Sequence, residues 1–188
     1  MEHLTGGRHK AIVAALAGRR IDARGDDTKQ FPIENAPAVR EALRALLRRE
    51  RVGVLVSSAA CGADLLALEV ALGLDINCHV ILPFNRETFR NTSVIDRPGD
   101  WGALYDFVLK KTSAANTLTV LENGENNELA YRAVTERIIH DAIEIAAPQH
   151  PLAIIVWEGR PRPDKDATAD FQRLAQAAGL SERIVSTC

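Results

Sequence analysis

Val52-Gly-Val-Leu-Val-Ser-Ser-Ala-Ala-Cys-Gly-Ala-Asp-Leu-Leu66 holds the pattern that decides the fold. Residues 52–57 are apolar almost throughout, which is typical of a strand buried on both faces of a sheet. The small residues from Ser58 to Gly62 predict a tight turn, and a helix is expected from Ala63 to Leu74. A buried strand that runs directly into a helix is the building unit of parallel α/β proteins.

The same unit recurs on both sides of this stretch. Short apolar runs alternate with segments of helical periodicity, which indicates right-handed parallel crossovers. Further strands are expected at 11–17, 78–83, 117–121 and 152–157, with a last short strand at 183–186. Further helices are expected at 38–49, 101–111, 126–147 and 167–178. We therefore predict an α/β fold, a three-layer Rossmann-like sandwich with a mostly parallel sheet of about five to six strands.

Composition limits the partners and the compartment. The 188 residues carry a formal net charge of −2, which gives no general attraction for nucleic acid or for anionic membranes. No apolar stretch is long enough to span a bilayer, and the start of the chain has no signal-peptide pattern. The odd number of cysteines, without a Cys-x-x-Cys pair, fits a reducing compartment. We expect one cytoplasmic domain over residues 1–188, with residues 1–10 flexible.

Ligands of such sheets bind where the strands end, near the point at which the strand order reverses. The first strand ends in Gly18, which lets the backbone turn sharply or approach a ligand. Arg19 and Arg20 follow, and their forked donors suit a phosphate. The alternative interpretation is a loop with solvated arginines.

The turn from Ser57 to Asp64 is the strongest candidate for ligand contact. Its small residues are expected to leave backbone N–H groups open, Ser57 and Ser58 can donate hydroxyl hydrogen bonds, and the start of the helix favours an anion. The alternative is a plain strand–helix turn in which the Asp64 carboxylate interacts with the helix dipole. The pKa of the Cys61 thiol could fall here, but no histidine neighbours it, so a nucleophilic role is not favoured.

Two later strand ends add aromatic side chains. Phe84 follows Pro83 and could stack on a base or belong to the core, and the polar stretch 85–100 behind it is not assigned a helix. Trp157 could cover the end of the sheet or stack on a ring. Thr168 opens the last helix, where it could cap the helix or hold a phosphate.

The sequence lacks the motifs of several enzyme classes. It contains no Gly-x-Ser-x-Gly elbow and no phosphate-loop consensus, and its histidines are scattered without metal-ligand spacing. We therefore expect no metal and no cofactor. If the protein is an enzyme, Asp64 and Glu69 are the carboxylates that we expect near a strand end.

Three stretches together resemble the SLOG superfamily of LOG-like and DprA-like domains, in particular the nucleotide-sensing modules of bacterial signalling proteins. They are Ala-Gly-Arg-Arg-Ile-Asp (17–22), Ser-Ala-Ala-Cys-Gly-Ala-Asp-Leu-Leu (58–66) and Val-Ile-Leu-Pro-Phe (80–84). The resemblance implies a Rossmann-like fold that binds nucleotides at its strand ends. It carries ligand contact onto Gly18, Arg19, Asp22, Ser58, Cys61, Gly62, Asp64, Pro83 and Phe84.

One signature of these relatives is missing. LOG-type hydrolases carry Pro-Gly-Gly-x-Gly-Thr-x-x-Glu, whereas residues 159–170 lack those glycines and retain only Thr168 and Asp170. The difference argues against phosphoribohydrolase activity.

Two functions are compared on this basis. The first is a sensor that binds a nucleotide or a molecule derived from NAD or ADP-ribose and passes its occupancy to a partner. The second is an enzyme that cleaves or transfers an N-glycosidic bond through Asp64 or Glu69, as in LOG-like or deoxyribosyltransferase-like proteins. We favour the sensor, keep an assembly scaffold as a third option, and expect that the domain can pair into a homo-oligomer.

Overall fold

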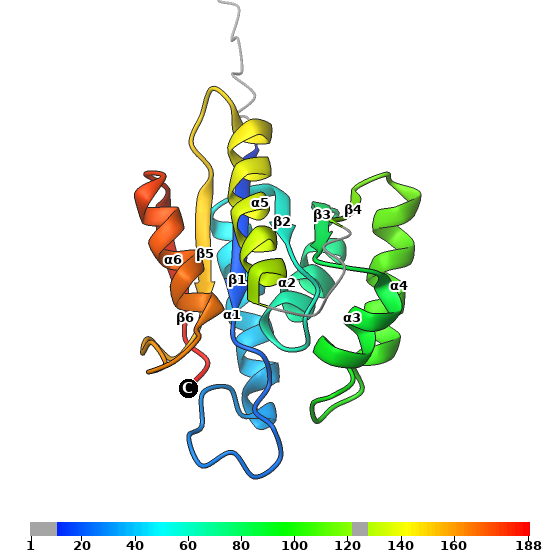
Figure 1. The fold of residues 1–188 in the computed structure, drawn as a ribbon. Coiled ribbons are helices and arrows are strands. Elements are labelled where there is room, and N and C mark those ends of the chain that lie inside the picture. Colours follow the sequence, from blue (N-terminus) through cyan, green and yellow to red (C-terminus); the bar gives the residue numbers. More distant parts are fainter. Residues whose placement is uncertain (1–10, 122–127) are drawn as a thin grey trace, which may run out of the picture.

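The computed structural model describes residues 11–121 and 128–188, so the expected flexibility of residues 1–10 lies outside the described residues (Figure 1). Within the described ranges, six parallel strands form one sheet in the order β4-β3-β2-β1-β5-β6. The predicted α/β class with a parallel sheet is confirmed. The strands are β1 (Ile12–Gly18), β2 (Val52–Ser57), β3 (Asn77–Leu82), β4 (Leu118–Val120), β5 (Leu152–Val156) and β6 (Ser181–Val185).

The predicted helices are present, although the first two residues of the one expected at 126–147 lie outside the described residues; a short 3-10 helix at 33–35 and a helix in the polar stretch 85–100 were not predicted. The helix in the stretch 85–100 is capped by Asn85, whose side-chain oxygen accepts a hydrogen bond from the N–H of Thr88 at 2.8 Å. It buries Phe89 and Ser93. None of the described helices is both long enough and apolar enough to cross a membrane. The helices are α1 (Ala36–Arg49), preceded by the short 3-10 helix η1 (Ile33–Asn35), α2 (Ala63–Leu72), α3 (Arg86–Ser93), α4 (Trp101–Ala114), α5 (Glu128–Ala146) and α6 (Ala167–Ala177).

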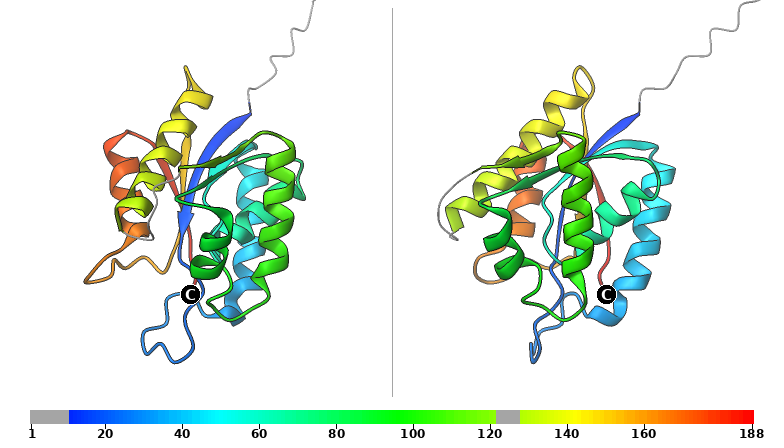
Figure 2. Two further views of the ribbon diagram at one scale, coloured as in Figure 1. Left: turned by 45° about the vertical axis from the view of Figure 1, so that its right-hand side comes forward. Right: turned by 90° about the vertical axis from the view of Figure 1, so that its right-hand side faces the viewer.

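The sheet lies between two layers of helices (Figure 2). Helices α1, α2 and α4 cover one face, and α5 and α6 cover the other. Alternate residues of the central strands supply two cores: Leu16 and Leu55 pack with the first layer, whereas Ala15 and Val56 pack with the second. Burial of both faces explains why the strands are apolar throughout. Full burial of a leucine stabilises the fold by about 1.5–3 kcal/mol.

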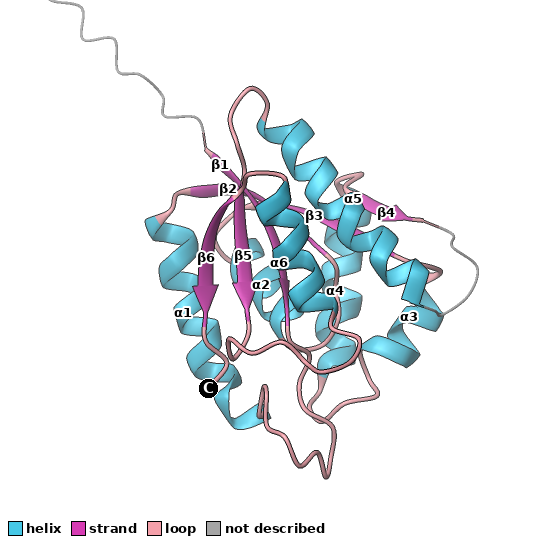
Figure 3. Cartoon of the chain, turned by 60° about the vertical axis from the view of Figure 1, so that its left-hand side comes forward, coloured by secondary structure: helices cyan, strands magenta, loops and turns pink. Residues whose placement is uncertain are grey.

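The strand order reverses between β1 and β5. From β1 the chain proceeds outward through β2 and β3 to β4, and then returns to the other side of β1 for β5 and β6. Gly18 is paired with Val156 in the register of these strands, so residues 19 and 157 leave the sheet side by side. The long loops gather at this carboxyl edge (Figure 3). This edge is where Rossmann-like sheets bind their ligands.

Gly18 and Gly62 bring α2 close to β1. A Cβ atom on Gly18 would lie 2.5 Å from the Cβ of Ala63, and a Cβ atom on Gly62 would lie 2.7 Å from the carbonyl oxygen of Arg19. Gly62 also has a φ of 94°, a conformation that favours glycine. The two glycines therefore set the packing of the strand ends, whatever further role they have.

Candidate functional site

Arg19 is buried at the point where the strand order reverses, with 2% of its surface exposed. Its Nε and Nη2 atoms donate to the two carboxylate oxygens of Glu158 at 2.8 and 2.9 Å. Its Nη1 atom donates to Oδ1 of Asp166 at 2.5 Å, and Nη2 also donates to the carbonyl oxygen of Arg160 at 2.7 Å. The guanidinium carbon lies 5.4 Å from the centre of the Trp157 ring. We call Arg19, Glu158 and Asp166 the switch-point cluster.

The charges of the switch-point cluster reinforce each other. Burial lowers the pKa of Arg19, but the hydrogen bonds to Glu158 and Asp166 outweigh this effect, so the pKa is raised above its ordinary value. Burial likewise opposes ionisation of Asp166, yet Arg19 and the N–H groups of Arg162 and Ala169 hold the pKa of that carboxyl below its ordinary value. Both groups therefore stay charged. Removing one partner of such a pair leaves a buried charge uncompensated.

Asp166 also caps α6. Its Oδ1 accepts hydrogen bonds from the N–H groups of Thr168 and Ala169, both at 3.1 Å, and its Oδ2 accepts one from the N–H of Arg162 at 2.7 Å. A carboxylate of the protein thus occupies the place at the start of α6 where an external anion would bind. Thr168, expected from the sequence to cap the helix or to hold a phosphate, lies buried in the first turn, and the capping residue is Asp166.

The backbone N–H groups of the Ser57–Asp64 turn are less open than expected. The N–H of Ala60 donates to Oδ2 of Asp64 at 3.2 Å. The N–H groups of Cys61 and Ala63 donate to the carbonyl oxygens of Ser93 and Arg19, both at 3.0 Å. The structure uses these donors to join the ends of β1, β2 and α3, so the expectation of an open phosphate cradle in this turn is wrong for these three groups.

Burial favours the neutral form of both titratable groups in this turn. Asp64 is 7% exposed, and burial raises its pKa to about 7, against the opposing effects of the Ala60 N–H and the charge of Arg20. Burial also raises the pKa of Cys61, although Arg20 opposes the shift. The suggestion that the Cys61 pKa falls is therefore wrong. Asp64 remains a carboxyl that can change its charge near neutral pH.

Several predicted site residues have clear local roles in the fold. The carboxylate of Asp22 accepts hydrogen bonds from the N–H groups of Gln30 and Phe31, and so closes the loop that follows β1. Phe84 is buried and packs against Phe89 and Tyr131, with ring centres 6.0 and 5.9 Å apart. Phe84 therefore belongs to the core, as does its buried neighbour Pro83.

Glu69 is not at the carboxyl edge with Asp64. Its carboxylate accepts a hydrogen bond from Nε of Arg40 in α1 at 2.8 Å, and it lines a surface hollow together with Asn77, the first residue of β3. Asp64 and Glu69 are five positions apart in α2, which turns the two side chains to different sides of the helix. The structure therefore does not combine them into a carboxylate pair.

A pocket of about 590 Å³ lies between α5 and α6, beside the switch-point cluster. Both helices begin at the carboxyl edge of the sheet, so the pocket opens where a Rossmann-like ligand would be held. Basic, acidic, hydroxyl, aromatic and apolar side chains share its wall. They are Glu128, Tyr131, Arg132 and Thr135 of α5, Arg162, Lys165 and Asp166 of the preceding loop, and Ala167, Asp170, Arg173 and Leu174 of α6.

Arg162 differs from the other basic residues of this pocket. It forms no ion pair with a residue that the structure describes, and its Nε donates to Oε1 of Gln30 at 2.5 Å. Burial and the nearby charge of Arg19 lower its pKa. Arg162 is therefore a cation for which an incoming anion would be a favourable neighbour. The other three basic residues of the pocket form ion pairs: Arg132 with Glu136, Lys165 with Glu128, and Arg173 with Asp170.

Three adjacent strands end in buried polar atoms that the described residues leave without a hydrogen-bond partner. These atoms are Oγ of Ser57, the last residue of β2, Nε1 of Trp157 after β5, and Nε of Arg20 after β1. Buried polar groups are normally hydrogen-bonded, so each exception needs an explanation. Ser57 and Trp157 were singled out from the sequence, and their unsatisfied atoms are consistent with a ligand at this edge.

Sequence reasoning missed Glu158, Arg162 and Asp166. Glu158 and Asp166 lie 139 and 147 residues from Arg19, and no local pattern connects such distant positions. A capping signal for Asp166 was present, because aspartate directly before a helical segment is a preferred N-cap. The sequence shows that Arg162 is charged, but it cannot show that Arg162 forms no ion pair with the described residues.

The sequence matches no known protein family and no curated protein. Among solved structures, the DNA processing protein A (DprA) from Streptococcus pneumoniae is similar, with a TM-score of 0.41 and 15% sequence identity. The similarity covers 93% of this chain and 59% of that protein. The present chain therefore corresponds to about three fifths of the other protein. At this level of similarity we draw no functional conclusion from it.

Proposed function

We propose that this domain binds a nucleotide or a nucleotide-derived molecule, such as one derived from NAD or ADP-ribose, at the carboxyl edge of its sheet and acts as a sensor. The observation that carries the proposal is the pocket of about 590 Å³ between α5 and α6, which contains Arg162 without an ion-pair partner among the described residues. Its volume suits a ligand of this size.

The mixed charge of the pocket favours a ligand that carries both phosphate and hydroxyl groups. The guanidinium of Arg162, which has no ion-pair partner among the described residues, can bind a phosphate through its Nη donors, since forked guanidinium donors match phosphate oxygens. Exposed ion pairs such as Arg173 with Asp170 contribute little stability, so a phosphate can replace the carboxylate in them. Carboxylates released in this way can accept hydrogen bonds from ribose hydroxyls.

The SLOG resemblance supports the same ligand class but suggested a different place. It pointed to the turns after β1 and β2, where the N–H groups of Ala60, Cys61 and Ala63 are already bonded. The α5–α6 side retains a pocket and an unpaired cation. We therefore place the phosphate of the ligand near Arg162, next to the switch-point cluster. Ser57 and Trp157 do not line this pocket, and the ligand contacts expected for them remain predictions.

The N-glycosidic enzyme is the weaker alternative. In its favour, Asp64 has a pKa of about 7 and lies at the correct edge, so it could supply a proton near neutral pH. Against it, Glu69 is paired with Arg40 on another side of α2 and offers no second carboxylate. Catalysis would require more functional groups from the described residues than binding does.

Isothermal titration with AMP, ADP, NAD and ADP-ribose tests the proposal. We expect at least one of them to bind the wild type, and Arg162→Gln to weaken that binding about tenfold or more, because hydrogen bonds to charged groups contribute about 1.5–3 kcal/mol. Arg44→Gln is the matched control, since Arg44 lies on α1 and pairs with Glu41. Folded protein that binds none of the ligands would refute the proposal. Release of free base by the wild type, lost in Asp64→Asn, would support the enzyme.

A further inference from the structure

The side-chain amide of Gln30 lies between a carboxylate and the arginine of the α5–α6 pocket. Its Nε2 atom donates to Oε1 of Glu158 at 3.1 Å, and its Oε1 atom accepts the hydrogen bond from Nε of Arg162 at 2.5 Å. Each end of the amide thus faces a group of the matching kind, an acceptor opposite the NH₂ group and a donor opposite the carbonyl oxygen. Exchanging the two ends would lose both hydrogen bonds, so the orientation of the amide is fixed.

The acceptor that faces Arg162 differs in charge from the acceptors that face the other basic residues of the pocket. Arg132, Lys165 and Arg173 each lie against a carboxylate. Nε of Arg162 instead lies against a neutral amide. A carboxylate at this place would cancel the charge of the guanidinium, whereas an amide satisfies one N–H group and leaves the charge in place.

The carboxylates of the switch-point cluster are already engaged by Arg19. Oε1 of Glu158 accepts a hydrogen bond from Nη2 of Arg19 at 2.9 Å in addition to the one from Gln30. Oδ1 of Asp166 accepts one from Nη1 of Arg19 at 2.5 Å, and its Oδ2 accepts one from the backbone N–H of Arg162. The cluster therefore anchors the backbone of Arg162, while the side chain of Arg162 is bonded to Gln30.

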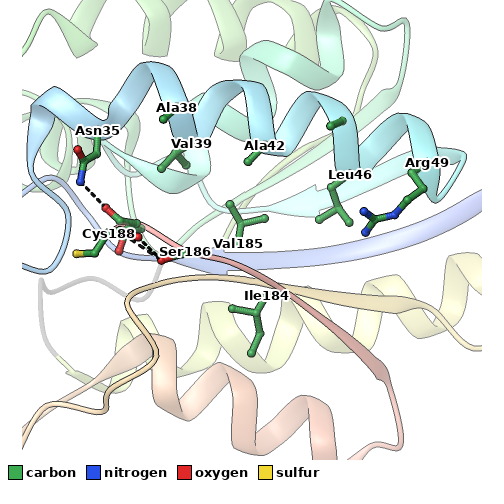
Figure 4. Close-up of a pocket in the computed structure, with 12 residues that line it drawn as sticks. Asn35, Ala38, Val39, Ala42, Leu46, Arg49, Ile184, Val185, Ser186 and Cys188 are labelled. Atoms are coloured by element: carbon green, nitrogen blue, oxygen red, sulfur yellow. Dashed lines mark hydrogen bonds between the residues drawn. The ribbon is translucent and has the colours of Figure 1, made fainter.

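The backbone of Gln30 is held from both sides. Its N–H donates to the two carboxylate oxygens of Asp22 at 3.1 and 3.2 Å, and its carbonyl oxygen accepts a hydrogen bond from the hydroxyl of Thr187, which is 1% exposed. Thr187 is fixed in turn, because its carbonyl oxygen accepts a hydrogen bond from Nδ2 of Asn35 at 2.9 Å (Figure 4). A side chain that orients another group needs this kind of support.

We propose that Gln30 is the positioning residue of the anion site. It orients the guanidinium of Arg162 through Nε and, because it is neutral, keeps the charge of Arg162 available for a phosphate. This inference rests on the proposed function, which places the phosphate of the ligand at Arg162. With Nε held by Gln30, the Nη1 and Nη2 groups form the fork that is left for two phosphate oxygens. The described residues accept no hydrogen bond from these two groups.

Two variants of Gln30 test the inference by isothermal titration. The probe is whichever of AMP, ADP, NAD and ADP-ribose binds the wild type most tightly. Gln30→Glu should weaken binding about tenfold or more, because its carboxylate pairs with Arg162 and competes with the phosphate as a tethered anion. Gln30→Met should weaken binding only about two- to fivefold, because the guanidinium keeps its charge but loses the acceptor that orients it.

The order of the two variants separates positioning from a structural role. If Gln30 only braced its loop, Gln30→Met would weaken binding at least as much as Gln30→Glu, because methionine forms no hydrogen bond with either neighbour. In an Arg162→Gln background, Gln30→Glu should weaken binding by less than about threefold, since its ion pair cannot form. Gln172→Glu is the matched control and should bind like the wild type. Gln172 also donates from Nε2 to a glutamate, Glu182, at 3.0 Å, but that glutamate belongs to β6.

Proton–nitrogen NMR spectra test the contact without a ligand. The Nε–H signal of Arg162, identified by its loss in Arg162→Gln, should exchange with water more slowly in the wild type than in Gln30→Met. Equal exchange rates would overturn the inference. So would a Gln30→Glu variant that binds like the wild type while Arg162→Gln weakens binding, and in that case the proposed function would stand. A wild type that binds none of the four nucleotides would refute the proposed function, and this inference with it.

Discussion

Arg19 and Asp166 are 147 residues apart in the sequence, yet Nη1 of the arginine lies 2.5 Å from Oδ1 of the aspartate at the point where the strand order reverses. The arginine leaves β1 and the aspartate starts α6, so this pair ties the two halves of the sheet together. It also neutralises the start of α6 with a carboxylate of the protein.

The first prediction concerns the stability that Arg19 contributes. Arg19→Met should lower the free energy of unfolding by about 3–5 kcal/mol, because it leaves the buried Asp166 carboxylate and the partly buried Glu158 carboxylate without their cation. Arg40→Met breaks the ion pair with Glu69, which is more exposed than the switch-point cluster, and should change the free energy of unfolding by less than about 1 kcal/mol. Urea denaturation of both variants provides the comparison, and equal losses would contradict this account of the cluster.

The second prediction concerns pH. The ordinary pKa of the Asp64 carboxyl is 3.8 and burial raises it to about 7 in the folded chain, so the folded state binds the proton more tightly than the unfolded state. The stabilising effect of that proton is complete below pH 3.8, decreases as the pH rises, and is lost above about pH 7. Asp64→Asn lacks this titration, so its unfolding free energy should fall less than that of the wild type between these limits. If the unfolding free energies of the wild type and Asp64→Asn change in parallel with pH, burial does not raise the pKa of Asp64.

The third prediction concerns the close approach of α2 to β1. Gly18→Ala should destabilise the fold by about 1–3 kcal/mol, because the added Cβ would lie 2.5 Å from that of Ala63. Gly73→Ala should be tolerated, since its added Cβ would find no atom nearer than 3.4 Å. Thermal melts of the two alanine variants show whether the loss of stability comes from the steric clash at Gly18 or from replacing any glycine by alanine. Equal melting temperatures would contradict the clash.

The fourth prediction concerns α3, the helix that the sequence did not reveal. Asn85→Ala should destabilise the protein by about 0.5–2 kcal/mol, because it removes the acceptor for the N–H of Thr88. Asn91→Ala, at an exposed position inside the same helix, should have little effect or stabilise slightly. If both variants unfold alike, the cap does not define the start of α3.

The fold was largely predictable because its signals are local. Each buried strand is a short apolar run, and each long helix has an apolar side, so the bounds of β2 and β5 differ from the prediction by at most one residue. The helix α3 escaped because Phe89 is its main apolar anchor and its remaining residues are polar. Its capping residue, Asn85, was the available signal.

The candidate site was less predictable because its interactions are distant in sequence. Position alone singled out Arg19, but the partners that decide its state, Glu158 and Asp166, come from the other end of the chain. The hydrogen bond from the N–H of Cys61 to the carbonyl oxygen of Ser93 likewise depends on how α3 packs. The ligand contacts expected at Gly18, Ser58 and the other strand-end residues remain predictions.

The Asp166 cap has a consequence for how this edge can be used. The start of α6 already holds an anion that is attached to the chain, at a local concentration no free molecule can match. Any phosphate that reached these N–H groups would have to displace a tethered competitor. A phosphate site at the start of α6 would then fill only at ligand concentrations well above those that saturate an uncapped helix start. In the empty domain, Asp166 would keep this end of the helix neutralised.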